Sequence, residues 1–463
     1  MKKEKISRRK FFTTTGLATA GLAISGKGYA GASAVMKKHE VLESVDVLVV
    51  GGGPAGIGAA LGAAWKGART MIIENQSFFG GVAACSLGMQ INQIRPNGLP
   101  RSVIHEEFIN KIATYGDQSI RYGKHEIWCN VEYMKVAILD ALEESGCKYL
   151  LHAGAVDAVV KNNRVEGVII GTKRGLKEIR AKVVVDCTGD ADVAYFAGAQ
   201  TMIDSDSLMP QTLSLMLSNI DKEKLPASEV RRRIESRLRD SVKEYPLVPS
   251  GFVDVVQMAN SNRWFVNHSG TANLGYIDVT DPYEYTRVAS FSSRQAIQMI
   301  QSIRESGDPG LERIELVGTG PRVSVRETRR VKGLYVLTEE DALNGRVFED
   351  TIAWRSGYID PGGQKNARGG KMMIHDVPYR SIVPEKLDGL LMAGRCISTN
   401  HMAAAAGKSM GNCMATGHAA GLAAAISSEK NIMPREISVP ELQDALRADG
   451  VDLDVKERLQ GRM

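Results

Sequence analysis

Near the N-terminal end of the chain, two short apolar runs enclose a glycine-rich stretch. Residues 45–50 (VDVLVV) form a β-branched run typical of a strand, and residues 70–73 (TMII) form a second. Between them lie three glycines in G-x-G-x-x-G spacing, followed by an Ala/Gly-rich stretch of helical length at residues 59–65. An acidic residue follows the second run. This order predicts a βαβ unit that binds a dinucleotide.

Each residue type in this stretch has a physical reason. Gly51 allows a tight turn, Gly53 lets a pyrophosphate approach the backbone, and Gly56 lets the helix pack closely on the sheet. The helix N-terminus offers free N–H groups to phosphates. Glu74, 18 residues after Gly56, is placed to accept hydrogen bonds from a ribose, which argues against NADP. The alternative is an ordinary glycine-rich turn. The residues expected at the phosphates are Gly51, Gly53, Pro54, Ala55 and Gly56.

The remaining pattern alternates helical and strand-like segments. Helices are expected at residues 101–115, 131–145 (closed by Gly146), 229–243, 286–305, 403–426 and 440–448. Strands are expected at residues 155–160 and 165–170 (a hairpin), 183–185 and 387–393. Residues 357–370 are rich in Gly and Pro and are expected to form a loop.

Two further turns follow strand-like runs, where the backbone could again meet a nucleotide. They contain Gly80 and Gly81, and Thr188, Gly189 and Asp190. The first could also be a simple turn, and the second a strand-end turn capped by Asp190.

The positive charge of the chain is concentrated at its start. The net charge is +5, but residues 1–30 carry seven Lys or Arg against one Glu, so the remainder sums to −1 and does not favour nucleic-acid binding. Residues 7–12 (SRRKFF) match the twin-arginine export pattern, and a mildly apolar stretch and A-x-A sites follow. We therefore expect a signal peptide over residues 1–34 and a periplasmic or otherwise exported protein; a disordered basic tail is the alternative. No stretch is long and apolar enough to span a membrane.

Composition indicates a globular protein of two or three domains, with 463 residues of which 43% are hydrophobic. Its six cysteines form no C-x-x-C pair, so no short-spaced zinc or iron–sulfur ligand set is expected. Scattered cysteines of this kind are more often buried small hydrophobes than disulfides.

Six segments together resemble the FAD-dependent oxidoreductases of the glutathione-reductase-like flavoprotein fold. More narrowly, they are distantly similar to the flavoprotein part of heterodisulfide reductase. The segments are VLVVGGGPAGIGAALGAAWKGARTMIIE, FFGG, AKVVVDCTGDADVAYFAGA, VRETRRVKGLYVLTEED, VPYRSIVPEKLDGLLMAGRCISTNHMA and MATGHAAGLAAA. Unlike heterodisulfide reductase, this chain lacks clustered cysteines, so any iron–sulfur chemistry would belong to a partner protein.

The resemblance implies an α/β protein that holds FAD noncovalently. It implies a Rossmann-like FAD-binding domain with a parallel sheet and a β-meander, and an inserted α+β substrate or cap domain. The expected FAD-binding parts are residues 45–200 and 379–430, the cap is 201–378, and a helical tail is 431–463. Beyond the first turn and Glu74, the implied FAD contacts are Gly80, Gly81, Thr188, Gly189, Asp190, Gly394, Arg395, Met410 and Gly411, the last two at a helix N-terminus facing the flavin.

Candidate catalytic residues lie in the second half of the chain. His401 follows the last FAD strand and is expected beside the flavin, where an imidazole serves as acid or base; a structural role in capping the helix is the alternative. Arg326, Arg329 and Arg330 are expected either to bind a substrate carboxylate or to form a solvated strand with ion pairs to nearby glutamates. Tyr379 with Arg380, and more weakly His268, complete the candidates.

Three functions remain open on the sequence. The leading interpretation is an exported flavoenzyme that transfers hydride or electrons between FAD and a small organic substrate. The second is an electron-transfer component of a partner redox complex, and the third is a flavin-binding module without turnover.

Overall fold

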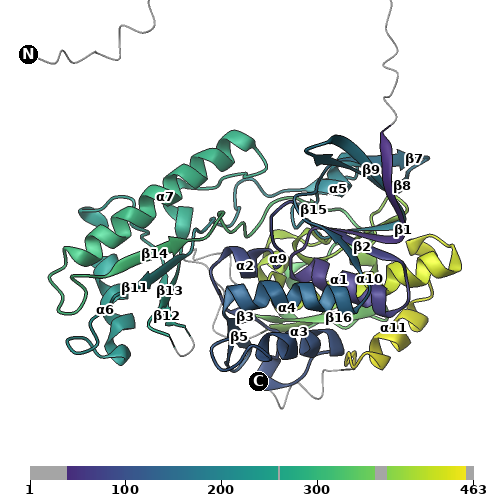
Figure 1. Ribbon diagram of the computed structural model, residues 1–463. Helices are drawn as coiled ribbons and strands as arrows, with labels where there is room; N and C mark the ends of the chain where they lie inside the picture. Colours follow the sequence, from purple (N-terminus) through teal and green to yellow (C-terminus); the bar gives the residue numbers. More distant parts are fainter. Residues whose placement is uncertain (1–38, 259–260, 360–372, 455–463) are drawn as a thin grey trace, which may run out of the picture. The chain divides into compact units, whose positions relative to one another are not determined.

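A seven-stranded sheet is the largest sheet in the computed structural model, which describes residues 39–258, 261–359 and 373–454 (Figure 1). Its strand order is β6-β2-β1-β9-β8-β7, and β18 pairs with β9. The strands are β1 (Glu40–Val50), β2 (Thr70–Ile73), β6 (Lys148–Leu150), β7 (Gly154–Lys161), β8 (Arg164–Thr172), β9 (Gly175–Asp186) and β18 (Leu390–Met392).

Strand β9 changes its neighbour half-way along. Its first half pairs antiparallel with β8, which continues the hairpin of β7 and β8 as a meander. Its second half pairs in parallel with β18, and β1 runs parallel along its other side. The predicted α/β class, parallel sheet and meander are therefore confirmed.

The parallel register brings distant parts of the sequence to one edge of the sheet. Val50 at the end of β1 lies opposite Ile73 of β2 and Asp186 of β9, and Asp186 lies opposite Met392 of β18. Since parallel strands end at the same edge, the loops after β1, β2, β9 and β18 are neighbours there.

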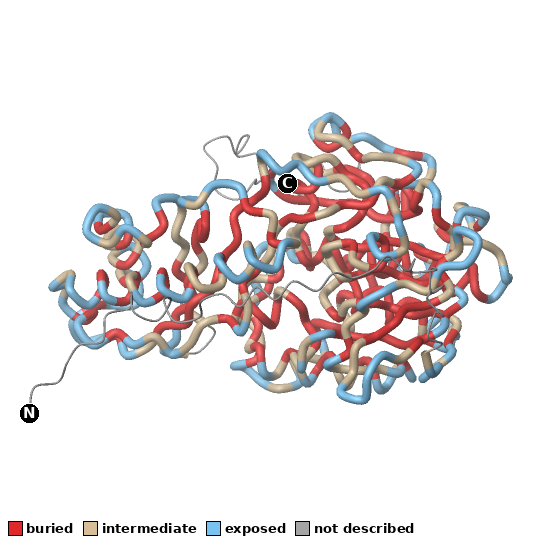
Figure 2. Tube along the Cα trace, turned by 90° about the horizontal axis from the view of Figure 1, so that it is seen from above, coloured by how far each residue is buried: buried red, intermediate tan, exposed pale blue. Residues whose placement is uncertain are grey.

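Two helices made of small residues pack against this sheet and against each other: α1 (Pro54–Trp65) and α10 (Met410–Lys430). Most residues of α1 and nearly all of α10 are buried. Figure 2 shows the buried interior of the protein in red. Glycines make the close approach possible, because a Cβ on Gly417 would overlap the carbonyl oxygen of Ala55, and one on Gly421 that of Ala59.

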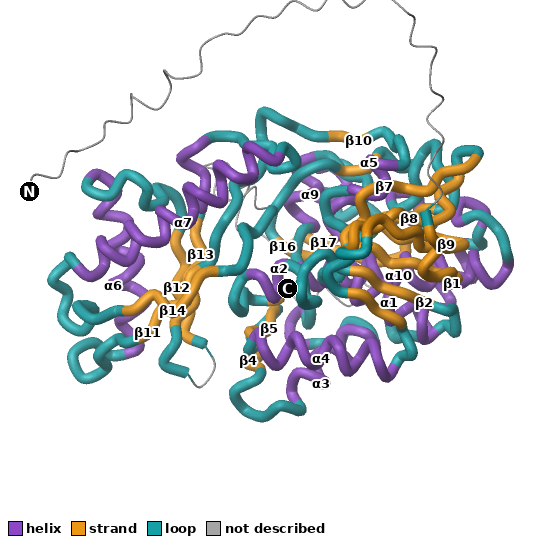
Figure 3. The backbone as a smooth tube through the Cα atoms, turned by 45° about the horizontal axis from the view of Figure 1, so that its top comes forward, coloured by secondary structure: helices purple, strands orange, loops and turns teal. Residues whose placement is uncertain are grey.

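A four-stranded antiparallel sheet has its own hydrophobic core, together with α6 (Ala227–Asp240) and α7 (Pro282–Arg304) (Figure 3). Its order is β12-β13-β11-β14. The strands are β11 (Leu215–Ser218), β12 (Val253–Gln257), β13 (Trp264–His268) and β14 (Glu315–Thr319).

Shorter elements complete the described chain. The other strands are β3 (Ile91–Asn92), β4 (Ile120–Tyr122), β5 (Glu126–Cys129), β10 (Thr201–Met202), β15 (Arg330–Val331), β16 (Thr351–Gly357) and β17 (Met373–Pro378). The other α-helices are α2 (Val82–Cys85), α3 (Val103–Ala113), α4 (Val131–Glu144), α5 (Asp192–Phe196), α8 (Glu339–Leu343), α9 (His401–Gly407) and α11 (Val439–Ala448).

Most of the predicted helices are confirmed, but the one expected over residues 403–426 is wrong in extent. It is two helices, α9 and α10, separated at Lys408 and Ser409. Gly407 ends α9 beneath the guanidinium of Arg355, and Ser409 takes the extended backbone from which α10 begins.

Some predictions fall outside the described residues: the signal peptide at 1–34, most of the loop at 357–370 and the end of the tail from 455. The domain boundaries at 200 and 378 remain predictions. The second core uses residues between Leu215 and Ile314, while Ile352 and Val377 belong to the core of the large sheet.

Candidate functional site

A cavity of about 640 Å³ lies at the edge where the parallel strands end. Its lining comes from the loops after β1, β2, β9 and β18, from the start of α10, and from β12 and β13 of the four-stranded sheet. The predicted cofactor residues that line it are Gly51, Gly53, Pro54, Ala55, Glu74, Gly81, Thr188, Gly189, Asp190, Gly394, Arg395 and Met410.

The three glycines of the first turn have separate surroundings. Gly51 has φ +101°, and a Cβ there would lie 2.6 Å from the carbonyl oxygen of Cys187. A Cβ on Gly56 would overlap the carbonyl oxygen of Gly51, so Gly56 packs directly against the backbone of the turn. Gly56 does not line the cavity. A Cβ on Gly53 would meet only the Cα of Gly81, at 3.8 Å, and Gly53 lines the cavity.

Two helix N-termini face the cavity without a side-chain cap. Helix α1 follows Gly53 and α10 follows Ser409; neither has a side-chain cap or an acidic residue in its first turn. Their first N–H groups and the positive ends of their dipoles therefore suit a bound anion such as a diphosphate.

Glu74 is buried at the end of β2 and organises the neighbouring backbone. Its carboxylate accepts from the N–H of Gly52 at 2.7 Å and from that of Gln76 at 2.9 Å. Each carboxylate oxygen has a further acceptor position, so Glu74 can still accept a hydroxyl from the cavity.

Hydrogen bonds to the side chain of Asp186 stabilise the turn after β9. This buried carboxylate accepts from both the N–H and the hydroxyl of Thr188 and from the N–H of Ala194. Asp190 lies on the cavity side and accepts from Arg395 at 2.9 Å and from Thr328 at 2.6 Å. Burial alone would raise the pKa of Asp190, but the Arg395 charge and the Thr328 hydrogen bond outweigh it and lower that pKa.

Asp192 also lines the cavity, but the pKa of its carboxylate is shifted upward, in the opposite direction to that of Asp190. Burial and the nearby charges of Asp190 and Asp186 raise its pKa to about 7, although Arg329 donates to it at 2.7 Å. A carboxyl with a raised pKa in the folded protein contributes its stability at low pH and loses it as the pH rises through that value.

We therefore expect the stability of the protein to fall between about pH 4 and pH 8 in part because of Asp192. In Asp192→Asn this contribution is absent, so its melting temperature should depend less on pH over the same range. Thermal unfolding at a series of pH values measures this, and parallel pH profiles of the two proteins would contradict it.

The opposite side of the cavity is made of residues that the sequence did not reveal. They are Met89, Gln90, Asn92, Gln93, His125 and Glu126 near β3 and β5, and Phe252, Asp254 and Asn267 on or beside β12 and β13. They lie in short strands and loops with no spacing that marks them, so only the fold brings them together.

Residues 326–330 run from the cavity lining into the protein interior. Arg326 lines the cavity; its guanidinium donates to the Pro210 carbonyl at 3.4 Å and the Asn267 side chain at 3.5 Å, and lies 5.6 Å from the ring centre of Phe252. Arg329 pairs with Asp192 instead and does not line the cavity.

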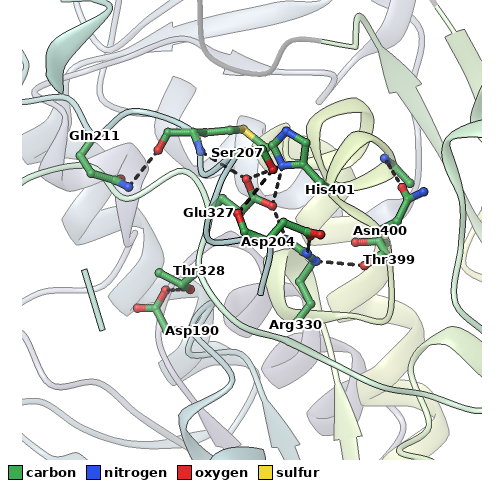
Figure 4. A network of polar contacts seen from close by, with 12 residues as sticks. Asp190, Asp204, Ser207, Gln211, Glu327, Thr328, Arg330, Thr399, Asn400 and His401 are labelled. Atoms are coloured by element: carbon green, nitrogen blue, oxygen red, sulfur yellow. Dashed lines mark hydrogen bonds and ion pairs between the residues drawn. The ribbon is translucent and has the colours of Figure 1, made fainter. Parts of the chain in front are cut away.

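Arg330 lies in a buried network with Glu327 and His401 (Figure 4). It is 1% exposed and pairs with both Glu327 and Asp204. The expectation that this segment is solvated is wrong for Arg330 and Glu327, which are buried, but the expected ion pair to the nearby Glu327 is confirmed.

His401 is not among the residues that line the cavity. Its Nδ1 is 2.8 Å from a carboxylate oxygen of Glu327, on the inner side of the same segment. The structure thus gives it a position from which it orients residues 326–330, and direct contact with a flavin stays a prediction.

The remaining predicted residues lie away from the cavity surface. Arg380 is half exposed and pairs with Asp350 at 2.9 Å. Tyr379 is buried and donates to the Pro434 carbonyl. Buried His268 bonds within its own loop and to the Leu213 carbonyl, and burial lowers its pKa to about 4. The glycines at 80 and 411 pack against protein, beside the Cβ of Ala84 and the carbonyl of Gln93 respectively.

All six cysteines are buried and unpaired: Cys85, Cys129, Cys147, Cys187, Cys396 and Cys413. Over residues 39–258, 261–359 and 373–454, no group of three or more His, Cys, Asp or Glu is arranged to hold a metal ion. No helix within the same part of the chain has the length and hydropathy to cross a membrane.

A model of the family described as "FAD dependent oxidoreductase" matches residues 46–446. The chain belongs to this family. The match includes both halves of the cavity edge, from the first glycine turn to the helix after Arg395, and membership implies FAD as the cofactor.

Curated relatives of this FAD-dependent oxidoreductase match over part of their length. A digeranylgeranylglycerophospholipid reductase of Thermoplasma volcanium is 29% identical over 198 residues, 39% of this chain and 48% of the relative. A thiamine thiazole synthase of Methanococcus vannielii is 34% identical over 168 residues, 33% of this chain and 59% of the relative. The matches thus span about half of the relatives.

Solved structures match most of the chain at low identity and with TM-scores below 0.5. A geranylgeranyl bacteriochlorophyll reductase-like protein of Thermoplasma acidophilum has 16% identity and a TM-score of 0.48, over 90% of this chain and 84% of that one. The flavin-dependent brominase Bmp2 has 12% identity and a TM-score of 0.44, over 88% and 83%.

The residues present fit FAD. The two uncapped helix N-termini suit its diphosphate, and Gly53 leaves the backbone open at the cavity. Arg395 also lines the cavity, and its Nη1 is buried without a hydrogen-bond partner among the described residues.

Proposed function

We propose that the protein holds FAD noncovalently in this cavity and transfers hydride or electrons between it and a small organic substrate. The observation that carries the proposal is that one cavity is lined both by the dinucleotide turn and by residues of a separate sheet. FAD supplies the redox chemistry in such enzymes, and the protein supplies binding, orientation and electrostatics.

In this proposal, Gly51, Gly53 and the start of α1 hold the diphosphate and Glu74 holds the ribose. Thr188, Gly189 and Asp190 support the cofactor from the turn after β9, with Asp190 fixing Arg395. The substrate would enter on the side of Phe252 and Asn267, where the lining has both apolar and hydrogen-bonding groups.

Arg326 is the proposed substrate-binding residue. It reaches this side of the cavity from the buried segment 326–330, and Asn267 and the ring of Phe252 lie beside its guanidinium. A planar guanidinium suits a carboxylate or a polarised carbonyl oxygen, so an acid or enone substrate fits the site.

The test is anaerobic reduction of the purified, FAD-loaded protein by a panel of hydroxy acids, and reoxidation of the reduced protein by unsaturated acids. One of these classes should bleach or restore the flavin absorption. If no small molecule does so while a redox protein does, an electron-transfer role replaces this proposal.

With a reacting substrate in hand, Arg326→Met should raise KM by about 10- to 100-fold through loss of charge-assisted hydrogen bonds, with FAD content unchanged. Arg346→Met is the matched control, because Arg346 pairs with Asp341 and does not line the cavity. Equal KM values for Arg326→Met and the unaltered enzyme would remove Arg326 from the substrate site.

Export by the twin-arginine pathway stays part of the proposal on sequence grounds, from residues 7–12. A fluorescent fusion of the leader, followed by cell fractionation, tests it. Retention of the fusion inside the cell would count against export.

A further inference from the structure

A second, much smaller cavity lies beside the first, under the end of β18. Its volume is about 10 Å³, room for one particle of the size of a water molecule. Its walls are strongly cationic, because Arg326, Arg330, Arg355, Arg395 and Lys408 line it against the single carboxylate of Glu327. The remaining lining residues are Thr328, Gly394, Ala404 and Gly407.

Arg355 is the buried charge in this wall that the protein does not compensate. It projects from β16, is 2% exposed, and forms no ion pair with a carboxylate among the described residues. Its Nη2 donates to the Gly394 carbonyl at 3.2 Å, while its Nε is buried without a hydrogen-bond partner there.

Two other deeply buried arginines, Arg330 and Arg101, have more interaction partners than Arg355. Arg330 pairs with two carboxylates, those of Glu327 and Asp204, and donates to the Thr399 carbonyl. Arg101 donates to three acceptors and lies 4.1 Å from the ring centre of Trp354. Arg355 differs from both, because among the described residues it has one hydrogen bond, to the Gly394 carbonyl, and neither a carboxylate nor an aromatic ring beside it.

A buried lone charge is costly, and arginine does not escape this cost by losing its proton. Burial lowers the pKa of Arg355 only to about 10, so it remains charged at neutral pH. Its neighbour Arg395, which lines the same small cavity, also has an Nη1 that is buried without a partner. The uncompensated charge of Arg355 indicates that negative charge is needed at this point, whereas Arg395 also lines the large cavity proposed for FAD.

We propose that this small cavity binds a single monatomic anion of the chloride class, held by the Arg355 guanidinium with Arg395 beside it. The size of the cavity excludes sulfate, phosphate and carboxylates, whose several heavy atoms need more room. Arg355 lines the small cavity and not the large one, whereas Arg326, Gly394, Arg395 and Lys408 line both, so the site adjoins the FAD cavity.

The direct test is a crystal structure of the FAD-loaded protein grown with sodium bromide, recorded at the bromine absorption edge. We expect an anomalous peak between Arg355, Arg395 and Gly407, and no peak in Arg355→Met. Electron density at this place without an anomalous signal would identify a water molecule and would overturn the proposal. An anomalous peak that persists in Arg355→Met would also overturn it.

Thermal unfolding of the same protein gives an independent readout. Replacing sodium gluconate by sodium chloride at constant ionic strength should raise the melting temperature by about 1–2 °C for each tenfold increase of chloride above its Kd. Arg355→Met should lose this dependence, and Arg180→Met, which changes an exposed arginine paired with Glu178, should keep it.

Arg355→Met should still fold, because replacing a buried uncompensated charge by an apolar side chain of similar length is often tolerated. If Arg355→Met unfolds, Arg355→Lys serves in its place, with the expected result of weaker chloride dependence. A bromide peak seen only at molar salt, with no chloride effect on melting, would identify an adventitious ion only and would also overturn the proposal.

Discussion

Gly53→Val is expected to abolish FAD retention while leaving the protein folded. Gly53 has φ −76° and an extended ψ, a backbone that valine accepts. A Cβ there would touch only the Gly81 Cα, at 3.8 Å, so the protein itself has room for it. The branched side chain would instead occupy the cavity surface at the start of α1, where the diphosphate is expected.

The measurement is FAD content per chain after purification, alongside circular dichroism for the fold. Gly56→Val is the matched comparison, because a Cβ at that position would overlap the Gly51 carbonyl, and we expect it to damage the turn and the fold together. A folded Gly53→Val protein that retains FAD as the unaltered protein does would contradict the assignment of this turn.

The second large effect is expected for Gly421→Val, which should destabilise the protein by about 3 kcal/mol or more. Gly421 lies inside α10, and a Cβ there would overlap the carbonyl oxygen of Ala59 on α1. Neither helix can move away, because both are buried between the sheet and their neighbours. The cost is therefore steric and falls on the contact that closes the FAD-binding half of the protein.

Thermal unfolding should show this as a melting temperature lower by about 3 °C or more, or as loss of soluble protein. Gly318→Val, in β14, is the control, since a Cβ there meets nothing within 4 Å, and its effect should stay within about 0.5 kcal/mol. Similar melting temperatures for the two variants would show that α1 and α10 do not need this close approach.

The cofactor side of the cavity could be predicted because its signals are local. The spacing from Gly51 to Glu74 is contained in one βαβ unit, and each residue type is required by the backbone around it. The later turns at Thr188 and Gly394 follow apolar strands, and parallel strands bring such turns to one edge.

The substrate side could not be predicted, for a physical reason. Phe252 and Asn267 lie on a four-stranded sheet with its own core, and only tertiary packing brings them to the cavity. The segment at residues 326–330 was misleading because its dense charge suggested solvent. Arg330 does pair locally with Glu327, but the other partners of the segment, Asp192 and Asp204, are more than 120 positions away in the sequence, so the local sequence does not indicate its burial.

The position of His401 also depends on tertiary structure that the local sequence does not indicate. Its place a few residues after the last strand suggested a position beside the flavin, and the helix after that strand does begin near the cavity. The helix is split, however, and His401 opens its first part, α9, where it faces Glu327. The Gly407–Ser409 break that separates the two helices has no clear signal in an Ala/Gly-rich sequence.

The central claim is that one FAD is held, without a covalent bond, where the ends of β1, β2, β9 and β18 meet. Heat denaturation of the purified yellow protein, followed by separation of the released flavin and its quantification, tests this most directly. We expect about one FAD per chain in the supernatant and none on the precipitated protein. A correctly folded protein that contains no FAD and takes up none when it is supplied would contradict it.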